Sequence, residues 1–449
     1  MAFYITINAF EGLQTMSFRS GSALSPNPGL DLWLRRLILI LGLPLLFLPK
    51  LNIVEVAKDS AGLRIDDVIL LLLVPLVALA VAIHRRPSVS RAECAFVVMM
   101  AIFLVSNAFN IAVYGYSNPL YAVRLAEYFL FYYIGAYSGP ILAPLCYALI
   151  GLNGVVMVLQ AFGVVGGFYS EGYGETASTR PIGLTGGPWE IAAVINIVFA
   201  TLLYQGKRNH WLLFVPTFAL LLLSGARSPA LIHLLVLAVF LFRRSRRKGV
   251  LVFRGAVVAV VGVAALLLIP NKVVERSKFL FTTENVKLAQ QIYERTELLP
   301  QFTSFESIGG GEESHDEESD RSWILRVTQW MYAYKQWSTT PSAWVIGLGP
   351  GMWGPSLDGG WLRLLTETGV VGLAAFVLFF NTLCTTPLLK AVRFCLYLNM
   401  AFIDIYISYK TMALVFLIAG ATVGAARLAE AARPRGTSAG GELGAATPG

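Results

Sequence analysis

Twelve apolar stretches divide the chain, and they constrain its fold more than any other feature of the sequence. They cover residues 34–48, 68–83, 95–113, 122–136, 141–165, 191–204, 211–223, 230–242, 250–269, 362–384, 394–407 and 412–426. A membrane-spanning helix needs about 20 mainly apolar residues, and only helices and closed barrels satisfy their backbone hydrogen bonds in lipid. The pattern therefore predicts an all-α polytopic membrane protein with about 12 transmembrane helices.

Composition supports the same class. Hydrophobic residues make up 56% of the 449 residues and charged residues only 14%, with a mean hydropathy of +0.64. A soluble domain carries about 25% charged residues, so a water-soluble globular fold is excluded. The four cysteines show no CxxC spacing, and neither a disulfide framework nor a zinc site is expected.

The basic residues predict the orientation in the membrane. Short cytoplasmic loops accumulate Lys and Arg, and twelve alternating spans place every basic cluster on the side of the N-terminus. The clusters are Arg35/Arg36, Arg85/Arg86/Arg91, Lys207/Arg208, Arg243/Arg244/Arg246/Arg247/Lys248, Lys390/Arg393 and Arg427/Arg433/Arg435. We therefore expect both termini in the cytoplasm, and we interpret the formal net charge of +8 as a topology signal rather than a nucleic-acid footprint.

One long polar interruption separates the ninth and tenth stretches, on the outward side. The predicted division is a cytoplasmic segment 1–30, transmembrane helices one to nine in 31–269, a large outward loop with short helices in 270–357, transmembrane helices ten to twelve in 358–428, and a disordered cytoplasmic tail 429–449. Within the loop we expect a short amphipathic helix over 286–299, a mobile Gly-rich and acidic run over 304–320, and an aromatic-rich helix over 321–337.

Five arginines lie on the outward side. Arg124, Arg180 and Arg227 lie at or near the outward ends of predicted spans, and Arg321 and Arg326 belong to the predicted helix of the outward loop. Charges at membrane depth are costly and usually functional, and the planar guanidinium matches phosphate oxygens two at a time. We interpret these arginines as binding a lipid diphosphate. Arg124 can instead pair with Glu127 on its own helix face, and Arg321 and Arg326 can instead form a solvated face beside the acidic run.

The candidate proton acceptors are Asp358 and Glu367, at the start of the tenth span and about two turns into it. Asp358 can equally be a helix N-cap. Trp361 offers a flat face for a sugar ring, although tryptophan also anchors proteins at membrane interfaces. His233 is expected to be buried and hydrogen-bonded rather than catalytic.

Several enzyme classes lack their motifs in this sequence. There is no Asp-x-Asp triplet, no HExxH and no GxxxxGK[ST]. A metal-dependent sugar transferase, a zinc protease and an ATP-driven pump are therefore disfavoured, and we expect neither a metal nor a cofactor.

Three patches together resemble the O-antigen ligase and polysaccharide repeat-unit polymerase superfamily of bacterial envelopes. They are RPIGLTGGPWEIAAVI (180–195), LLLSGARSPALI (221–232), and the run RVTQW…TPSAWVIGLGPGMWG…DGGWLRLLTETGVVGLAAF (326–376). The family shows an Arg-x-x-Gly before a mid-chain span, a Ser-x-Ser/Ala-Arg turn, and a Gly-x-Gly loop that runs into a span with a Glu-x-Gly signature. Each motif is short, but all three occur in the family's order.

The resemblance implies a GT-C type membrane glycosyltransferase that acts on undecaprenyl-diphosphate-linked glycans at the periplasmic face of the bacterial inner membrane. Ligases of the family place a His where this chain has Asp358, which favours a polymerase of repeat units. The alternatives are a ligase that transfers finished glycan to a lipid or protein acceptor, and a lipid-linked glycan transporter. Expected partners are the polyprenyl-diphosphate-linked oligosaccharide, membrane lipid, and the flippase and chain-length regulator of the same pathway, with no nucleic acid.

Overall fold

The structure is a computed structural model in which helices dominate. It describes residues 28–49, 52–54, 63–83, 90–114, 119–167, 180–205, 210–244, 287, 290–291, 293–294, 321–353 and 357–431. Within these residues the only sheet is a short antiparallel pair, β1 (Asn52–Val54) and β2 (Leu63–Arg64).

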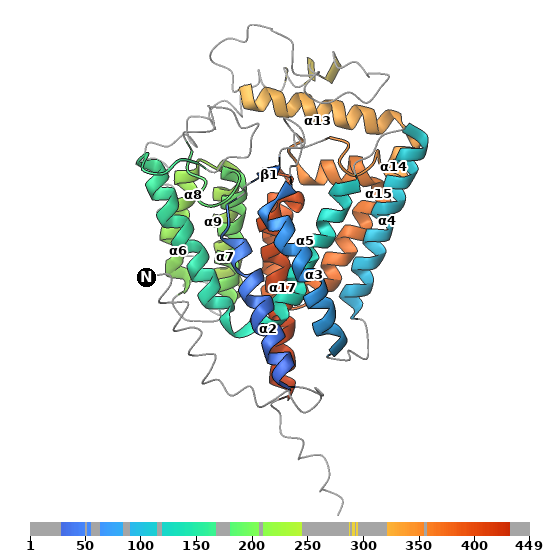
Figure 1. The fold of residues 1–449 in the computed structure, drawn as a ribbon. Helices are drawn as coiled ribbons and strands as arrows, with labels where there is room; N and C mark the ends of the chain where they lie inside the picture. The colour runs from blue at the N-terminus through green and yellow to red at the C-terminus, as the bar shows by residue number, and fades with distance from the viewer. Residues whose placement is uncertain are drawn as a thin grey trace, which may run out of the picture.

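Helices running between the two ends of the molecule form a bundle (Figure 1). They are α2 (Pro28–Gly42), α3 (Ile65–Ile83), α4 (Arg91–Tyr114), α5 (Pro119–Ser138), α6 (Leu142–Ala161), α7 (Pro188–Tyr204), α8 (Phe214–Ser224), α9 (Arg227–Arg244), α15 (Gly360–Leu383), α16 (Pro387–Asn399) and α17 (Tyr409–Ala431). Each predicted apolar stretch overlaps one of these helices, except the stretch at 250–269, which lies outside the described residues.

Two further helices lie at one end of the bundle. Helix α13 (Arg321–Thr339) runs across that end, with α14 (Pro341–Ile346) beside it (Figure 1). The aromatic-rich helix predicted over 321–337 is therefore confirmed. The two helices share a small apolar core with the segment that leads into α15, formed by Tyr332, Ala333, Ala343, Leu348, Trp353 and Leu357. The predicted helix over 286–299 lies mostly outside the described residues, and the acidic run over 304–320 wholly so.

The helices carry the features of a helical membrane protein. Helices α3, α4, α6 and α15 are long and apolar enough to cross a membrane, and α7, α8, α9 and α17 contain shorter apolar segments. Large apolar side chains also face outward from the bundle, for example Leu71 at 73% exposure, Leu231 at 67% and Leu378 at 64%. A soluble monomer rarely exposes so much apolar surface, whereas lipid is a favourable environment for it.

The eleventh predicted stretch is displaced from the helix that the structure contains. We expected a span over 394–407, but α16 covers Pro387–Asn399 and a linker of residues 400–408 follows it. Thr386 caps the helix by accepting a hydrogen bond from Leu389 N at 3.3 Å. The carbonyl oxygens of Met400 and Ile403 then accept the amides of Trp361 and Gly360 at the start of α15. These two carbonyl groups of the linker bind the start of α15 instead of continuing the hydrogen-bond pattern of α16.

Helices α5 and α17 pack with their backbones nearly touching. A Cβ atom on Gly420 would lie 1.8 Å from the carbonyl oxygen of Tyr132, and one on Gly424 would lie 2.1 Å from that of Ala136. Small residues at this four-residue spacing allow such contact in membrane bundles, where close packing replaces the hydrophobic driving force. This pair anchors α17, and with it the preceding linker, to the centre of the bundle.

His233 occupies the buried environment that we expected. Its Nδ1 lies 2.8 Å from Asn196 Oδ1 and its Nε2 lies 2.9 Å from Thr217 Oγ1. Asn196 is held in turn by the carbonyl oxygen of Pro229 at 2.9 Å. Both ring nitrogens are therefore satisfied inside the bundle, and a structural role for His233 is confirmed.

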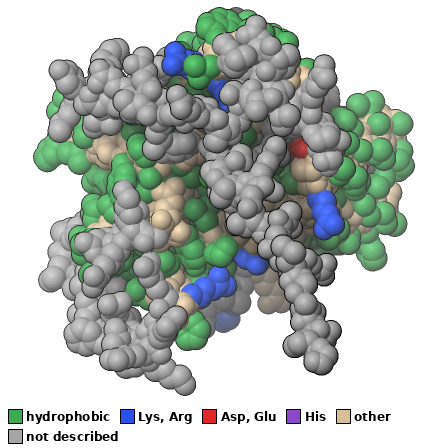
Figure 2. Space-filling view, turned by 90° about the horizontal axis from the view of Figure 1, so that it is seen from below, with side chains coloured by type: hydrophobic (Ala, Val, Ile, Leu, Met, Phe, Trp, Pro, Cys, Tyr) green, Lys and Arg blue, Asp and Glu red, His purple; other side chains and the backbone are tan. Residues whose placement is uncertain are grey.

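Basic side chains lie at the end of the bundle opposite α13. Exposed Arg91 begins α4 and exposed Arg243 lies in the last turn of α9. Figure 2, seen from below, shows Lys and Arg at several points of this face and little acidic surface among the coloured residues. In the predicted orientation this face is cytoplasmic.

Candidate functional site

The candidate site begins at a break in α15. Gly369 has φ 66° and ψ −175°, which interrupts the helix. In an unbroken helix the carbonyl groups of Thr366 and Glu367 would accept amides four residues on. They accept instead from Leu348 N at 2.8 Å and Gly349 N at 2.9 Å, in the Gly-rich loop after α14.

Glycine is required on both sides of this contact. A Cβ on Gly347 would lie 2.2 Å from the carbonyl oxygen of Glu367, and one on Gly369 would lie 2.3 Å from that of Val345. Both glycines also have positive φ angles, which disfavour other residues. The loop and the helix break therefore lock together, and this lock fixes the position of Glu367.

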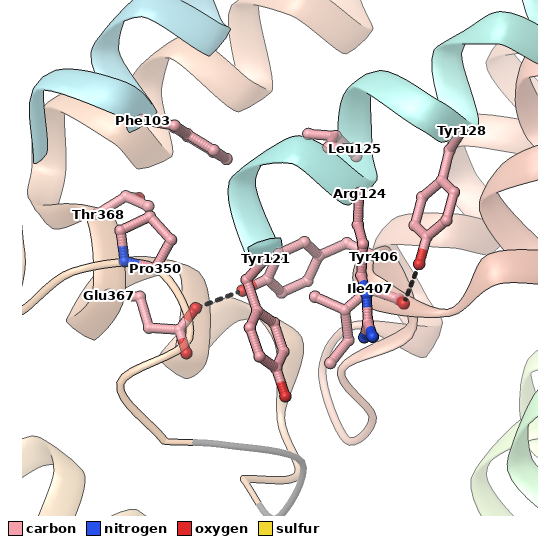
Figure 3. Close-up of a pocket in the computed structure, with 10 residues that line it drawn as sticks. All are labelled: Phe103, Tyr121, Arg124, Leu125, Tyr128, Pro350, Glu367, Thr368, Tyr406 and Ile407. Carbon is pink, nitrogen blue, oxygen red and sulfur yellow. Dashed lines mark hydrogen bonds between the residues drawn. The ribbon is translucent and has the colours of Figure 1, made fainter. Parts of the chain in front are cut away.

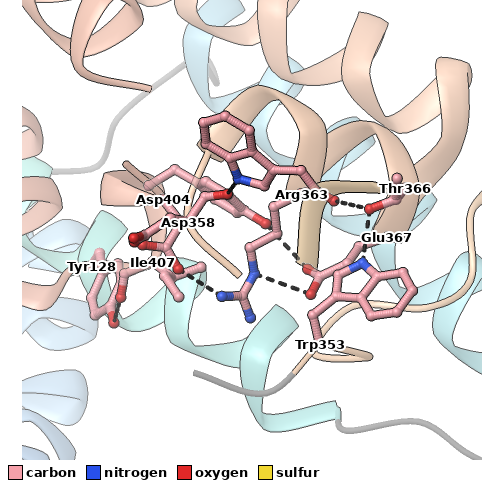
Figure 4. Close-up of polar contacts among 10 residues, drawn as sticks. Tyr128, Trp353, Asp358, Arg363, Thr366, Glu367, Asp404 and Ile407 are labelled. Atoms are coloured by element: carbon pink, nitrogen blue, oxygen red, sulfur yellow. Dashed lines mark hydrogen bonds and ion pairs between the residues drawn. The ribbon is translucent and has the colours of Figure 1, made fainter. Parts of the chain in front are cut away.

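Arg363, one turn before Glu367, is at the centre of a buried charge cluster (Figure 4). The side chain is completely buried. Its Nε lies 3.1 Å from Glu367 Oε1, and its Nη1 lies 2.6 Å from Asp404 Oδ2 in the linker. The Tyr406 hydroxyl donates to Glu367 Oε2 at 3.1 Å. We call Arg363, Glu367, Asp404 and Tyr406 the Arg363 cluster.

Asp358, just before α15, faces a second arginine. Arg326 Nε on α13 lies 2.5 Å from Asp358 Oδ2, and the indole N–H of Trp330 donates to the Asp358 carbonyl. The N-cap of α15 is Gly359, and no side chain caps this helix. The N-cap alternative for Asp358 is therefore wrong, because its carboxylate binds α13 instead. This contact ties α13 to the start of α15.

The two aspartates differ in exposure. The Asp358 side chain remains 25% exposed, whereas Asp404 is buried. Burial raises the pKa of Asp404 to about 7, Arg363 acts in the opposite direction, and the negative charge of Asp358 raises it further. The two carboxylates, which lie close together in Figure 4, thus interact electrostatically.

A pocket opens beside the cluster, between α4, α5, α15 and the linker (Figure 3). It is lined by Phe103, Tyr121, Arg124, Leu125, Tyr128, Pro350, Glu367, Thr368, Tyr406 and Ile407. The guanidinium groups of Arg124 and Arg363 each lie 5.3 Å from the centre of the Tyr121 ring. The pairing of Arg124 with Glu127, three residues further along α5, stays a prediction. The pocket combines a cation, a carboxylate and aromatic rings.

Arg180 lies beside the turn between α8 and α9. Its Nη2 is 3.5 Å from the carbonyl oxygen of Gly225, and Arg227 begins α9 two residues later. The structure thus brings the backbone of the SGAR turn to Arg180. The side chains of Arg227 and Arg321 lie outside the described residues.

Residues 180–187, which precede α7, form a loop that we call the Arg180 loop. Glu190 links this loop to the linker that contributes Asp404 and Tyr406 to the Arg363 cluster. Its Oε2 accepts from Gly186 N at 2.8 Å, and its Oε1 accepts from Ser408 Oγ at 2.6 Å. Gln160 Oε1 fixes the same loop by accepting from Ile182 N and Gly183 N at 2.9 and 2.8 Å. Two polar regions that are remote in sequence are therefore joined through one buried carboxylate.

Trp361 does not line the pocket. Its indole N–H donates to the carbonyl oxygen of Tyr397 at 2.9 Å, and its ring packs edge-on against Tyr397 and Phe376. The side chain therefore joins α15 to α16, and this geometry favours a packing role over stacking on a sugar.

The sequence reasoning missed Arg363, Asp404, Tyr406 and Tyr121. One signal was present, because Arg363 and Glu367 have the four-residue spacing of a helical ion pair. Asp404 lies inside the apolar stretch that we had assigned to a helix, and no local pattern there indicates a carboxylate facing α15.

Neither a model of a known protein family nor a curated protein matches this chain in sequence. The functional argument therefore depends on the site itself.

Proposed function

We propose that this protein is a membrane glycosyltransferase of the polymerase type. It would join undecaprenyl-diphosphate-linked oligosaccharide repeat units into a surface or secreted polysaccharide at the periplasmic face of a bacterial inner membrane. In this proposal the bundle has about 12 transmembrane helices in a GT-C type architecture, both termini are cytoplasmic, and the α13 end faces outward.

One observation carries the proposal. Arg180, Arg326, Asp358 and the Arg363 cluster gather at the α13 end of the bundle, where Glu190 connects the Arg180 loop to the linker that bears Asp404. A transporter would be expected to line a path through the bilayer depth with such groups. Their position at one end suits a reaction at one membrane surface.

In this proposal the arginines bind the leaving group and a carboxylate accepts the proton. Arg180, with Arg227, binds the donor's lipid diphosphate and stabilises the charge that builds on it as it leaves. A hydroxyl oxygen of the acceptor sugar forms the new bond to the donor's anomeric carbon. The bond between that carbon and the diphosphate oxygen breaks, and its electron pair leaves with the diphosphate. The hydroxyl proton passes to a carboxylate.

Asp358 is better placed than Glu367 to take that proton. Both oxygens of Glu367 are occupied, one by Arg363 and one by Tyr406. Asp358 is bound by Arg326 through Oδ2 and keeps a quarter of its side chain exposed. We therefore assign Asp358 as the base and Glu367 to the framework of the pocket.

The test is the glycan that accumulates when the gene is deleted from its host. Single lipid-linked repeat units should accumulate, and the wild-type gene should restore long chains. Full-length lipid-linked chains would instead identify a ligase, and unchanged glycans would refute the proposal. A gene that encodes Glu93→Gln serves as a control for loss of a carboxylate and should restore long chains as the wild-type gene does. Glu93 lies at the opposite end of the bundle, where its carboxylate accepts from Ser90 N at 2.7 Å.

A further inference from the structure

The proposed reaction joins two lipid-linked molecules, but Arg180 and Arg227 account for only one of them. The donor loses its diphosphate, whereas the acceptor keeps its own diphosphate after the new bond has formed. The acceptor therefore needs a second site, which binds a diphosphate without activating it as a leaving group. The pocket beside the Arg363 cluster has the features of such a site.

This pocket lies apart from Arg180. It is formed between α4, α5, α15 and the linker, whereas Arg180 contacts the turn between α8 and α9. Figure 1 shows α8 and α9 on the left of the bundle and α4 and α15 on the right, with α17 between them. Two lipid headgroups therefore have separate places at the α13 end.

Arg124 determines the charge that the pocket presents. Among the described residues that line it, only Arg124 and Glu367 are charged. Glu367 already binds the guanidinium of Arg363 through Oε1 and the hydroxyl of Tyr406 through Oε2, so its charge is compensated within the framework. Arg124 is half-buried, and its guanidinium lies 5.3 Å from the centre of the Tyr121 ring (Figure 3). An incoming anion therefore meets a positive charge on this wall.

Two other carboxylates are near the pocket but do not line it. Asp404 binds Arg363 through a different nitrogen, Nη1, and its pKa of about 7 leaves it partly protonated at neutral pH. Glu127 follows Arg124 by three residues on α5, and its effect can be measured separately with its own variant.

The walls of the pocket also suit a lipid. Phe103 and Leu125 add apolar surface beside Arg124. Helices α4 and α5 expose further apolar side chains on the outside of the bundle, including Val105 at 62% and Val123 at 43%. In the proposed orientation the outer leaflet surrounds these helices, so a polyprenyl chain remains in lipid while its headgroup reaches Arg124.

We propose that this pocket is a second lipid-diphosphate site, in which Arg124 binds the diphosphate of the acceptor. The inference rests on the proposed function, because a polymerase joins two substrates that both carry a lipid diphosphate. The guanidinium group matches phosphate oxygens two at a time. The acceptor's diphosphate stays bonded to its sugar throughout, and no covalent bond is made or broken at Arg124.

The first experiment counts bound lipids. Undecaprenyl diphosphate without a sugar is added to the purified full-length protein, and native mass spectrometry determines how many molecules each protein binds. The wild type should bind two molecules, and Arg124→Gln and Arg180→Ala should each bind one. A wild type that binds only one, or an Arg124→Gln variant that still binds two, would overturn the inference. The wild-type count remains decisive if a variant folds poorly.

The second experiment compares two acceptors in lipid nanodiscs, with the lipid-linked repeat unit from the deletion strain as donor. One acceptor is the same lipid-diphosphate-linked unit, and the other carries the repeat unit on a neutral alkyl chain. Arg124→Gln should lower kcat/KM for the diphosphate acceptor by about 10–100-fold and change it little for the neutral acceptor. Equal losses with both acceptors would mean that Arg124 binds an acidic sugar or supports the fold, and would exclude the acceptor's diphosphate as its ligand.

Glu127→Gln is the matched control, because it changes the neighbouring charged residue on the same helix. It should lower kcat/KM for neither acceptor. Equal losses in Glu127→Gln and Arg124→Gln would mean that Arg124 acts only as the partner of Glu127, which contradicts the inference. A wild-type protein that elongates neither acceptor would refute the proposed function itself, and the lipid count would still decide whether the pocket binds a second diphosphate.

Discussion

Arg363 Nη1 lies 2.6 Å from Oδ2 of Asp404, 41 residues further along the chain. This contact joins the first turns of α15 to the linker that precedes α17, and Arg363 also holds Glu367. One buried cation therefore organises two carboxylates from separate segments. The arrangement has consequences for stability as well as for chemistry.

Replacing Arg363 should destabilise the protein strongly. Arg363→Met leaves Glu367 and Asp404 buried without their cation, and breaking a buried pair in this way costs about 3–5 kcal/mol. The yield of monodisperse protein in detergent and the midpoint of thermal unfolding should both fall. Arg91→Met, at an exposed arginine, is the control and should change neither. Equal behaviour of the two variants would show that the cluster is not needed for folding.

Adding one carbon atom at the contact between the Gly-rich loop and α15 should also destabilise the protein. Gly347→Ala places a Cβ 2.2 Å from a backbone carbonyl oxygen at a position with φ 75°, and should destabilise the protein by more than about 1 kcal/mol. Gly151→Ala in α6 is the matched control, because its Cβ meets nothing within 4 Å. That variant should be neutral or slightly more stable, since alanine favours helix. Similar unfolding midpoints for the two variants would contradict the lock.

The sequence predicts much of the helical framework. Each apolar stretch between polar breaks is expected to form a helix, because in lipid the backbone N–H and C=O groups must form hydrogen bonds with one another. It also predicts α13 from its aromatic spacing and the burial of His233. It fails at α16, where Thr386 sets the start of the helix and α15 captures the following backbone. It fails again for Asp404, because a contact across 41 residues leaves no local pattern.

Arg180 should be sensitive to shape as well as charge. Arg180→Ala should abolish or greatly reduce chain elongation in the complementation assay while the protein still reaches the membrane. Arg180→Lys should restore little activity, because a point charge replaces a planar fork that binds two oxygens. Membrane levels measured by immunoblot separate loss of function from loss of protein. Near-normal elongation by the alanine variant would remove this arginine from diphosphate binding.

Orientation can be tested independently of chemistry. Reporter fusions after Arg243 and after Arg427 should indicate the cytoplasm, and a fusion within α13 should indicate the periplasm, because positive loops remain inside. A periplasmic signal from the fusion after Arg243 would reverse the topology and place Arg180, Asp358 and the Arg363 cluster on the wrong side for a periplasmic polymerase.

The final prediction separates the two candidate carboxylates. Asp358→Asn keeps the shape of the side chain and removes its charge, and no helix cap is lost, because Gly359 occupies the N-cap of α15. If Asp358 takes the hydroxyl proton, elongation should fall by about 10²–10⁴-fold with folded protein retained.

Glu367→Gln should behave differently, because this carboxylate binds Arg363 and Tyr406. Its main effect should be on the amount and thermal stability of the protein, since the glutamine leaves Arg363 with only Asp404 as an ionic partner. Folded Glu367→Gln protein should keep more activity per molecule than folded Asp358→Asn protein. The reverse order would make Glu367 the base, and full activity in both would mean that the arginines stabilise the leaving diphosphate enough for the hydroxyl to react without a protein base.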